Sequence, residues 1–221
     1  MNRRLLSSQS VSAFDLDHTL FIDNAGYRFG RYLCQKKVIS PFSLLFIYRS
    51  AILHRMGLLS IEQLHQQAFH RLFCGRSAAE IKSWANRFLD EHFDHILYPP
   101  AVNHLKAAQK QGHLTVIMSS SLDFLVEPIA ARLNVPLWHA TRYDVDKYGN
   151  FCNISSLMLG DTKASILEKL RLEQGIAVEQ IYAYSDSHLD LPFLMAAGNP
   201  VGVNPNRRLL AICRKNQWPI I

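Results

Sequence analysis

The sequence predicts an α/β fold in which a parallel, doubly wound sheet carries an inserted block of helices. Short β-prone runs at residues 11–14, 113–121 and 181–185 alternate with helical segments, a pattern typical of parallel sheets. By contrast, residues 25–97 show apolar groups at helical spacing and no strand. Ligands of parallel sheets bind beyond the carboxyl ends of the strands, so the polar residues that end these runs are candidates for a site.

Within the helical block, four helices are expected, at residues 27–38, 42–56, 61–73 and 77–93. Their ends carry the usual signals, which are a proline in a first turn, glycine stops and capping residues: Pro41, Gly57, Gly75, Ser60 with Gln63, and Ser77 with Glu80. After this block the chain returns to alternation. The expected elements are helices 99–112, 122–133 and 161–172, strands 113–121, 137–143, 181–185 and 200–203, and a hairpin turn at 148–150.

Composition describes a globular protein with an excess of positive charge. The 221 residues are 48% hydrophobic and 19% charged, with a net charge of +6, and the pI is near 9.2. This balance favours anionic partners such as phosphorylated compounds or a membrane surface. No run of five or more Lys and Arg occurs, so nucleic-acid binding is not expected.

Cysteine usage and the N-terminus both favour the cytoplasm. The four cysteines are widely spaced and form no CxxC motif, as in proteins of a reducing compartment: Cys34, Cys74, Cys152 and Cys213. Arg3 and Arg4 precede only two leucines before the polar run 7–10, which lacks the apolar core of a signal peptide. The oligomeric state cannot be read from the sequence.

Two carboxylates follow the first predicted strand at alternate positions. In extended backbone, Asp15, Asp17 and Thr19 point to one side and crowd together. Close carboxylates repel each other unless a cation or a proton separates them. The alternative is a polar turn, or an Asx turn that leads into a helix.

These groups suit the hydrolysis of a phosphate ester. Asp15 can attack phosphorus, and Asp17 can protonate the leaving oxygen and later activate water. Asp186 would complete a Mg²⁺ site with Asp15 and the backbone carbonyl of Asp17. Ser119, beside N–H groups at a helix start, and Lys163 suit the phosphate oxygens. Taken singly, each has an ordinary alternative: a helix N-cap for Ser119, a solvated lysine for Lys163, and a cap and a surface acid for Asp186 and Asp190.

The conjunction of motifs resembles the haloacid dehalogenase superfamily, in its phosphoserine-phosphatase-like branch, subfamily IB. The resembling segments are FDLDHTL, IMSSS followed by FLVEPIA, GDTKASIL, AYSDSHLDLPFL and the tail from Val201. The resemblance implies a Rossmann-like, three-layer core at residues 1–24 and 98–221 and an all-helical cap at 25–97. It also implies Mg²⁺ dependence and hydrolysis of a phosphomonoester through an aspartyl-phosphate.

The same resemblance implies a role for each matching residue. Asp15, Asp17 and Lys163 are catalytic, and Asp15, Asp17 and Asp186 hold the metal. Phosphate is expected to contact four residues, which are Thr19, Ser119, Ser120 and Lys163, and Asp190 supports the site.

Three positions depart from the branch. Leu189 replaces an Asn before the last aspartate, and Asn24 stands where phosphoserine-specific members carry Glu. Arg71 is only a loose counterpart of their cap arginine. A free amino acid needs partners for its ammonium and its carboxylate, so phosphoserine is not the first expected substrate.

The segment 38–55 is unusually apolar. Arg49 interrupts it at a cost of about 2.5–3.5 kcal/mol for a central position in a bilayer, so it is not expected to span a membrane. It is read first as a buried cap helix, and alternatively as an interfacial helix in peripheral contact with lipid.

Three functions therefore stand. The first is a Mg²⁺-dependent phosphatase acting on a small phosphomonoester. The second is a lipid-phosphate phosphatase, of the phosphatidylglycerophosphate type, at the membrane surface. The third is a catalytically weak relative that binds phosphate compounds. Sequence does not separate hydrolase from phosphotransferase.

Overall fold

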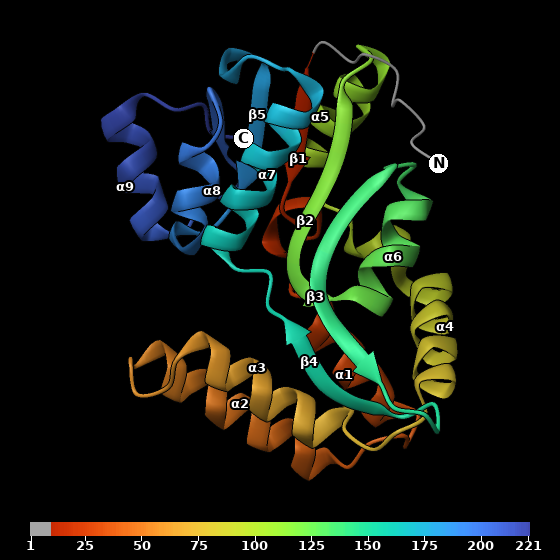
Figure 1. Ribbon diagram of the computed structural model, residues 1–221. Coiled ribbons are helices and arrows are strands. Elements are labelled where there is room, and N and C mark those ends of the chain that lie inside the picture. The colour runs from red at the N-terminus through yellow and green to blue at the C-terminus, as the bar shows by residue number, and fades with distance from the viewer. Residues whose placement is uncertain (1–9) are drawn as a thin grey trace.

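The protein forms a six-stranded sheet with helices on both faces (Figure 1). The structure, a computed structural model, describes residues 10–221. The strands are β1 (Val11–Phe14), β2 (Leu114–Leu122), β3 (Leu137–Val145), β4 (Phe151–Ser156), β5 (Ile181–Ser185) and β6 (Asn199–Gly202). The helices are α1 (Ala25–Gln35), α2 (Pro41–Arg55), α3 (Ile61–Leu72), α4 (Ala78–Ile96), α5 (Pro99–Lys110), α6 (Asp123–Arg132), α7 (Gly160–Gln174), α8 (Leu191–Met195) and α9 (Arg207–Asn216).

The strand order is β4-β3-β2-β1-β5-β6, so β1 and β2 are the two central strands. All neighbours pair in parallel except β3 and β4, which form the hairpin expected around Tyr148–Asn150. Alternate residues of β1 face two cores. Val11 and Ala13 pack with α7–α9, whereas Phe14 packs on the side of α5 and α6. The predicted α/β fold with a largely parallel sheet is therefore confirmed.

The helical stretch between Ile22 and Leu97 begins and ends at one place. The Ile22 N–H donates to the Ile96 carbonyl (2.9 Å), and the Tyr98 N–H donates to the Leu20 carbonyl (2.8 Å). All four expected helices are present there, as α1–α4. Phe29 and Tyr32 on α1 pack against Phe88 on α4 with ring centroids 5.7 and 5.5 Å apart.

The β3–β4 hairpin holds the helical stretch at a second place (Figure 1). The Gly75 N–H donates to the Phe151 carbonyl (2.8 Å), and the Phe151 N–H donates to the Arg76 carbonyl (2.9 Å). The Ala78 N–H donates to the Gly149 carbonyl (2.9 Å). The turn between α3 and α4 is therefore hydrogen-bonded to the hairpin.

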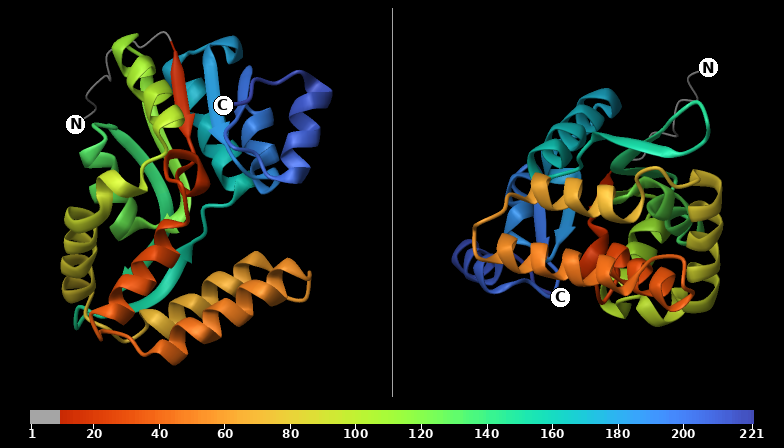
Figure 2. Two further views of the ribbon diagram at one scale, coloured as in Figure 1. Left: turned by 180° about the vertical axis from the view of Figure 1, so that it is seen from behind. Right: turned by 90° about the horizontal axis from the view of Figure 1, so that it is seen from below.

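Helix α2 differs from the expectation of a buried helix. Its buried residues are Ser43 and Ser50, whereas Phe42, Leu45 and Tyr48 are 75%, 64% and 57% exposed. The small Ser50 side chain lets α2 pack closely on α3, where it donates to Gln67 Oε1 (2.6 Å). Figure 2 shows α2 and α3 as a pair that projects from the rest of the molecule. The side chains of Phe42 and Leu45 are left uncovered on this pair.

In residues 10–221 no helix is long and apolar enough to cross a membrane. All four cysteines lie in this part of the chain and are unpaired. The signal-peptide argument rests on Arg3 and Arg4, which lie outside the described residues.

Candidate active site

The first predicted motif forms a tight turn at the carboxyl end of β1. The Asp15 N–H donates to the Tyr184 carbonyl of β5 (2.9 Å), and Leu16–Leu20 then make one turn in which His18 has φ of +58°. The expected extended backbone is therefore wrong beyond Asp17, and the two carboxylates meet different partners. Thr19 nevertheless reaches Asp15, donating to Oδ2 over a long 3.4 Å.

Lys163 joins two segments that are far apart in sequence. Its Nζ donates to Asp15 Oδ1 and to Asp190 Oδ2, at 2.7 Å each, and the side chain is only 2% exposed. Ser185 also donates to Asp190 Oδ2 (2.8 Å). The solvated-lysine alternative is therefore wrong. Burial alone would lower the pKa of Lys163, but the charges of Asp15 and Asp190 outweigh it and raise that pKa above its ordinary value.

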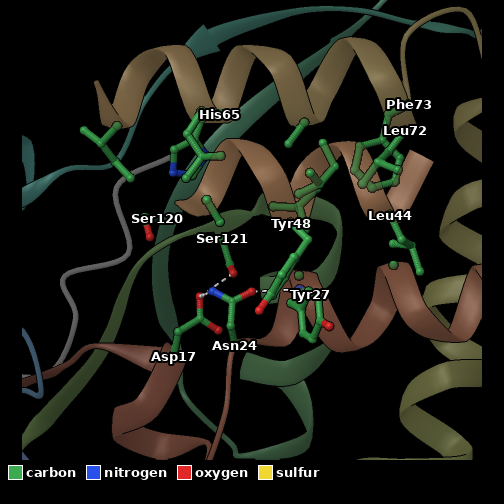
Figure 3. Close-up of a pocket in the computed structure, with 18 of the residues that line it drawn as sticks. Asp17, Asn24, Tyr27, Leu44, Tyr48, His65, Leu72, Phe73, Ser120 and Ser121 are labelled. Atoms are coloured by element: carbon green, nitrogen blue, oxygen red, sulfur yellow. Dashed lines mark hydrogen bonds between the residues drawn. The ribbon is translucent and has the colours of Figure 1, made fainter. Parts of the chain in front are cut away.

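Asp17 is held by three donors, drawn in part in Figure 3. The Ala25 N–H donates to Oδ1 (2.7 Å), while Asn24 Nδ2 (3.1 Å) and Ser121 Oγ (2.7 Å) donate to Oδ2. Asn24 also caps α1 by accepting from the Tyr27 N–H (2.7 Å). Burial raises the pKa of Asp17, and the donors of Ala25 and Ser121 oppose that rise. The departure at Asn24 thus supplies a contact to the predicted acid.

The three serines take roles that the sequence did not separate. Ser119 is fully buried within β2 and accepts from the Ser121 N–H (3.0 Å), so it is not the expected N-cap of α6. Ser120 lines a chamber beside Asp17 (Figure 3). Ser121 was missed, although it contacts Asp17. The irregular pairing of β2 between Ser119 and Leu122 decides which serine faces inward.

Asp186 follows β5 and brings further negative charge to the site. Burial, together with the charge of Asp190, raises its pKa to about 6. Burial also raises the pKa of Asp15, and the charge of Lys163 opposes this rise. The charges of Asp190, Asp186 and Asp17 raise the pKa of Asp15 further. The carboxylates therefore outnumber the one lysine that they face.

This donor set suits a divalent cation. No three His, Cys, Asp or Glu side chains in residues 10–221 gather into a metal cluster. The groups that would hold a cation are the Asp15 and Asp186 carboxylates with the backbone carbonyl of Asp17. All three are hard oxygen donors, which Mg²⁺ prefers, and two acids with raised pKa values gain from a nearby cation.

Leu189, which replaces the Asn that often precedes the last aspartate of the family motif, is 52% exposed. Its carbonyl lies against Gly160 at the start of α7, where an added Cβ would stand 2.3 Å from the oxygen. Close approach of these two backbones places Lys163 beside Asp190, and a glycine is required for it.

A chamber of about 520 Å³ opens onto Asp17 and Ser121 (Figure 3). Its walls come from α1, α2 and α3, and its far end reaches Leu72 and Phe73. No pattern in the sequence indicates this space.

Relatives with known names match most of the chain. It is 28% identical over 216 residues to the "Inhibition of morphological differentiation protein" of Streptomyces azureus, covering 96% of this chain and 78% of that protein. It is 24% identical over 223 residues to a histidinol-phosphatase of Neisseria meningitidis serogroup C, covering 96% and 98%. It is 26% identical over 218 residues to a phosphoserine phosphatase of Mycobacterium tuberculosis, covering 96% and 70%.

A solved structure and a family match agree with these relatives. A protein of unknown function from Bordetella pertussis Tohama I superimposes with a TM-score of 0.85 at 23% identity, covering 97% of this chain and 98% of that one, which confirms the fold. Residues 13–195 match the haloacid dehalogenase-like hydrolases. The predicted enzyme class, a phosphatase of this type, is confirmed by that match and by the phosphatase relatives. The chain therefore belongs to the haloacid dehalogenase-like hydrolase family.

Proposed function

We propose that the protein is a Mg²⁺-dependent hydrolase of a phosphomonoester, acting in the cytoplasm through an aspartyl-phosphate on Asp15. The observation that carries the proposal is the buried contact of Lys163 with both Asp15 and Asp190, at 2.7 Å each. A lysine with two buried carboxylates around it is costly for stability alone, since apolar residues would fill the space equally well. Such a cation beside a carboxylate at a strand end suits the transfer of an anionic phosphoryl group.

Each residue has a proposed role in two steps. Asp15 attacks phosphorus to form the aspartyl-phosphate while Asp17 gives its proton to the leaving oxygen. Asp17 then takes a proton from the water that attacks the intermediate, which releases phosphate and restores Asp15. The raised pKa of Asp17 favours the protonated state that the first step needs. Lys163 stabilises the charge of the phosphoryl oxygens.

The remaining predicted residues have supporting roles. Of the phosphate-binding candidates, Ser120 lines the chamber. Thr19 and Ser119 are fully buried, and Thr19 donates to Asp15 Oδ2 while Ser119 accepts from the Ser121 N–H. Asp15, Asp186 and the carbonyl of Asp17 would hold Mg²⁺, which supplies positive charge against the phosphoryl oxygens.

We further propose that residues 25–97 act as a cap that selects the substrate. Relatives of similar identity are named for histidinol phosphate and phosphoserine, two different esters. Overall sequence similarity therefore does not identify the alcohol part of the substrate, and we infer that the side chains lining the chamber determine it.

The test is hydrolysis of an aryl phosphate with and without Mg²⁺. We expect turnover that needs Mg²⁺, is abolished in Asp15→Asn and persists in Asp161→Asn, which makes the same change at an exposed residue of α7. Turnover by Asp15→Asn equal to wild type would refute the proposed nucleophile. If no variant turns over, binding of beryllium fluoride with Mg²⁺ separates a narrow substrate range from a lost activity.

A second candidate, a lipid-phosphate phosphatase, is favoured by the composition of the segment that contains α1 and α2. Between Asp23 and Glu62 the chain has six Lys and Arg and no Asp or Glu, which equals the whole net charge of +6. This segment also carries the exposed Phe42 and Leu45. Apolar and basic groups together suit an anionic lipid surface.

Vesicle sedimentation tests this candidate. Wild type is expected to pellet with vesicles containing phosphatidylglycerol and not with phosphatidylcholine alone. Leu45→Glu should abolish pelleting, whereas Leu172→Glu, at an equally exposed leucine of α7 (63%), should retain it. Wild type that stays in the supernatant with both vesicles would exclude the candidate.

A further inference from the structure

The position of the chamber relative to Asp17 shows which half of the substrate would occupy it. Asp17 and Ser121 lie at one end of the chamber, and α1–α3 enclose the rest (Figure 3). In the proposed function Asp17 protonates the leaving oxygen, so the alcohol lies on the Asp17 side of phosphorus. The chamber therefore extends where the alcohol must lie.

The walls of the chamber are mainly apolar. Leu44, Ile47 and Ala51 on α2 face Leu64 and Ala68 on α3, and all five are half-buried. These side chains retain accessible surface toward the chamber even though they come from elements packed together. An apolar ligand would remove that surface from water, which is the main favourable term in binding such a molecule.

Charged groups are scarce in the chamber. Of the described residues that line it, Asp17 is the one carboxylate, and it belongs to the proposed chemistry. Arg55 lines the chamber but is exposed at its edge. Burial lowers the pKa of His65, although Glu62 opposes this, so the ring is neutral at pH 7 and presents a hydrogen-bonding group. A charged alcohol would lose its hydration here, with Asp17 as the one carboxylate and Arg55 as the one arginine among the lining residues.

Two glycines on one face of α1 let other walls of the chamber approach this helix closely. A Cβ at Gly26 would lie 3.3 Å from Leu122 Cδ1, and one at Gly30 would lie 3.3 Å from Leu44 Cδ2. Both positions line the chamber. Glycine weakens a helix relative to alanine, so its use four residues apart is explained by the close approach of the chamber walls.

We propose that the chamber binds the alcohol half of the substrate, and that this alcohol is bulky, uncharged and mainly apolar. An alkyl chain or an aromatic ring fits, with one hydrogen-bonding group opposite His65. The proposal rests on the proposed function and names its substrate class. It separates the chain from enzymes of amino-acid phosphates, whose ammonium and carboxylate groups both need charged partners.

The test is a series of ethyl, butyl, hexyl and octyl phosphates, compared with phosphoserine and glycerol phosphate. We expect kcat/KM to rise about threefold to fourfold per methylene until the chamber is full. Phosphoserine and glycerol phosphate should not exceed ethyl phosphate. Equal kcat/KM along the alkyl series, or a preference for phosphoserine, would overturn the proposal while leaving the hydrolase intact.

A matched pair of variants on α2 locates the effect. Ala51→Phe fills the chamber and should lower the ratio of kcat/KM for octyl phosphate to that for ethyl phosphate at least tenfold. Ile52→Phe makes a comparable change one residue away, at a side chain that is 43% exposed and does not line the chamber, and should match wild type. Ala68→Phe on α3 repeats the test if Ala51→Phe fails to fold. Octyl phosphate turned over equally by all of these variants would place its chain elsewhere.

Binding separates this proposal from the reaction itself. If no ester is hydrolysed, calorimetry with Asp15→Asn still measures the affinity of the chamber for the same series of alkyl phosphates. Affinity that rises with chain length would support the apolar site whatever the outcome for the reaction. Affinity independent of chain length would refute the apolar site.

Discussion

Replacing Lys163 by Met tests the centre of the site most directly. The substitution preserves length but removes both 2.7 Å contacts and leaves Asp15 and Asp190 buried without a counter-charge. Breaking a buried ion pair from one side costs about 3–5 kcal/mol, so the free energy of unfolding should fall by that amount at pH 7.5. Urea unfolding, followed by tryptophan fluorescence in EDTA, measures the change.

The loss should depend on pH in a definite direction. Lys163 lowers the pKa of Asp15, which burial already raises well above 3.8, so its removal raises that pKa further. The folded variant then binds a proton that the unfolded chain releases above about pH 4, and its stability falls as pH rises through that window. At pH 5 the penalty should be smaller than at pH 7.5, because protonation removes the unpaired charge.

The control is Lys169→Met on the same helix. Lys169 is 75% exposed and 3.8 Å from Glu173, so its removal should cost under about 0.5 kcal/mol at both pH values. A Lys163→Met penalty under about 1 kcal/mol, or one that is equal at pH 5 and pH 7.5, would refute the argument that Lys163 compensates buried carboxylates.

Three further predictions concern the same site. Gly160→Ala should destabilise the fold by about 1–3 kcal/mol and abolish turnover, since its Cβ would lie 2.3 Å from the Leu189 carbonyl; wild-type urea midpoint and kcat would contradict this. Because burial raises the pKa of Asp186 to about 6, protons compete with Mg²⁺ below that pH. The rise in Tm on adding Mg²⁺ should therefore grow from pH 5 to pH 7.5, and an equal rise at both would count against Asp186 as a ligand. Ser121 lowers the pKa of Asp17, so Ser121→Ala should move the alkaline limb of kcat/KM upward by about one pH unit, and an unmoved limb would exclude the contact from the reaction.

Signals that act over a few residues were read correctly from the sequence. The capping box of Ser60 and Gln63 is present with both of its hydrogen bonds, and Ser77 accepts from the Glu80 N–H. Capping depends only on residues three positions apart, so local sequence is sufficient to predict it. The strand-end positions of Asp15 and Asp186 were equally readable, because each follows a short apolar run.

Features that depend on distant packing were not readable. Ser121 rather than Ser119 reaches Asp17 because β2 is irregular against β3, and no nearby residue signals that irregularity. The apolar residues of α2 do not cluster on one side of the helix, so its sequence does not indicate which face is buried. Its two small residues, Ser43 and Ser50, are the buried ones, whereas the large side chains of Phe42 and Leu45 are exposed.

The two attachments of the helical stretch have a mechanical consequence. One tie lies at Ile22 and Ile96, and the other joins Arg76 to Phe151. Helix α4 is also held against α6, by an ion pair between Asp90 and Arg132. We therefore expect any opening of the chamber to move α2 and α3 rather than α4. Amide hydrogens at both ties should exchange more slowly than those in the turn between α2 and α3.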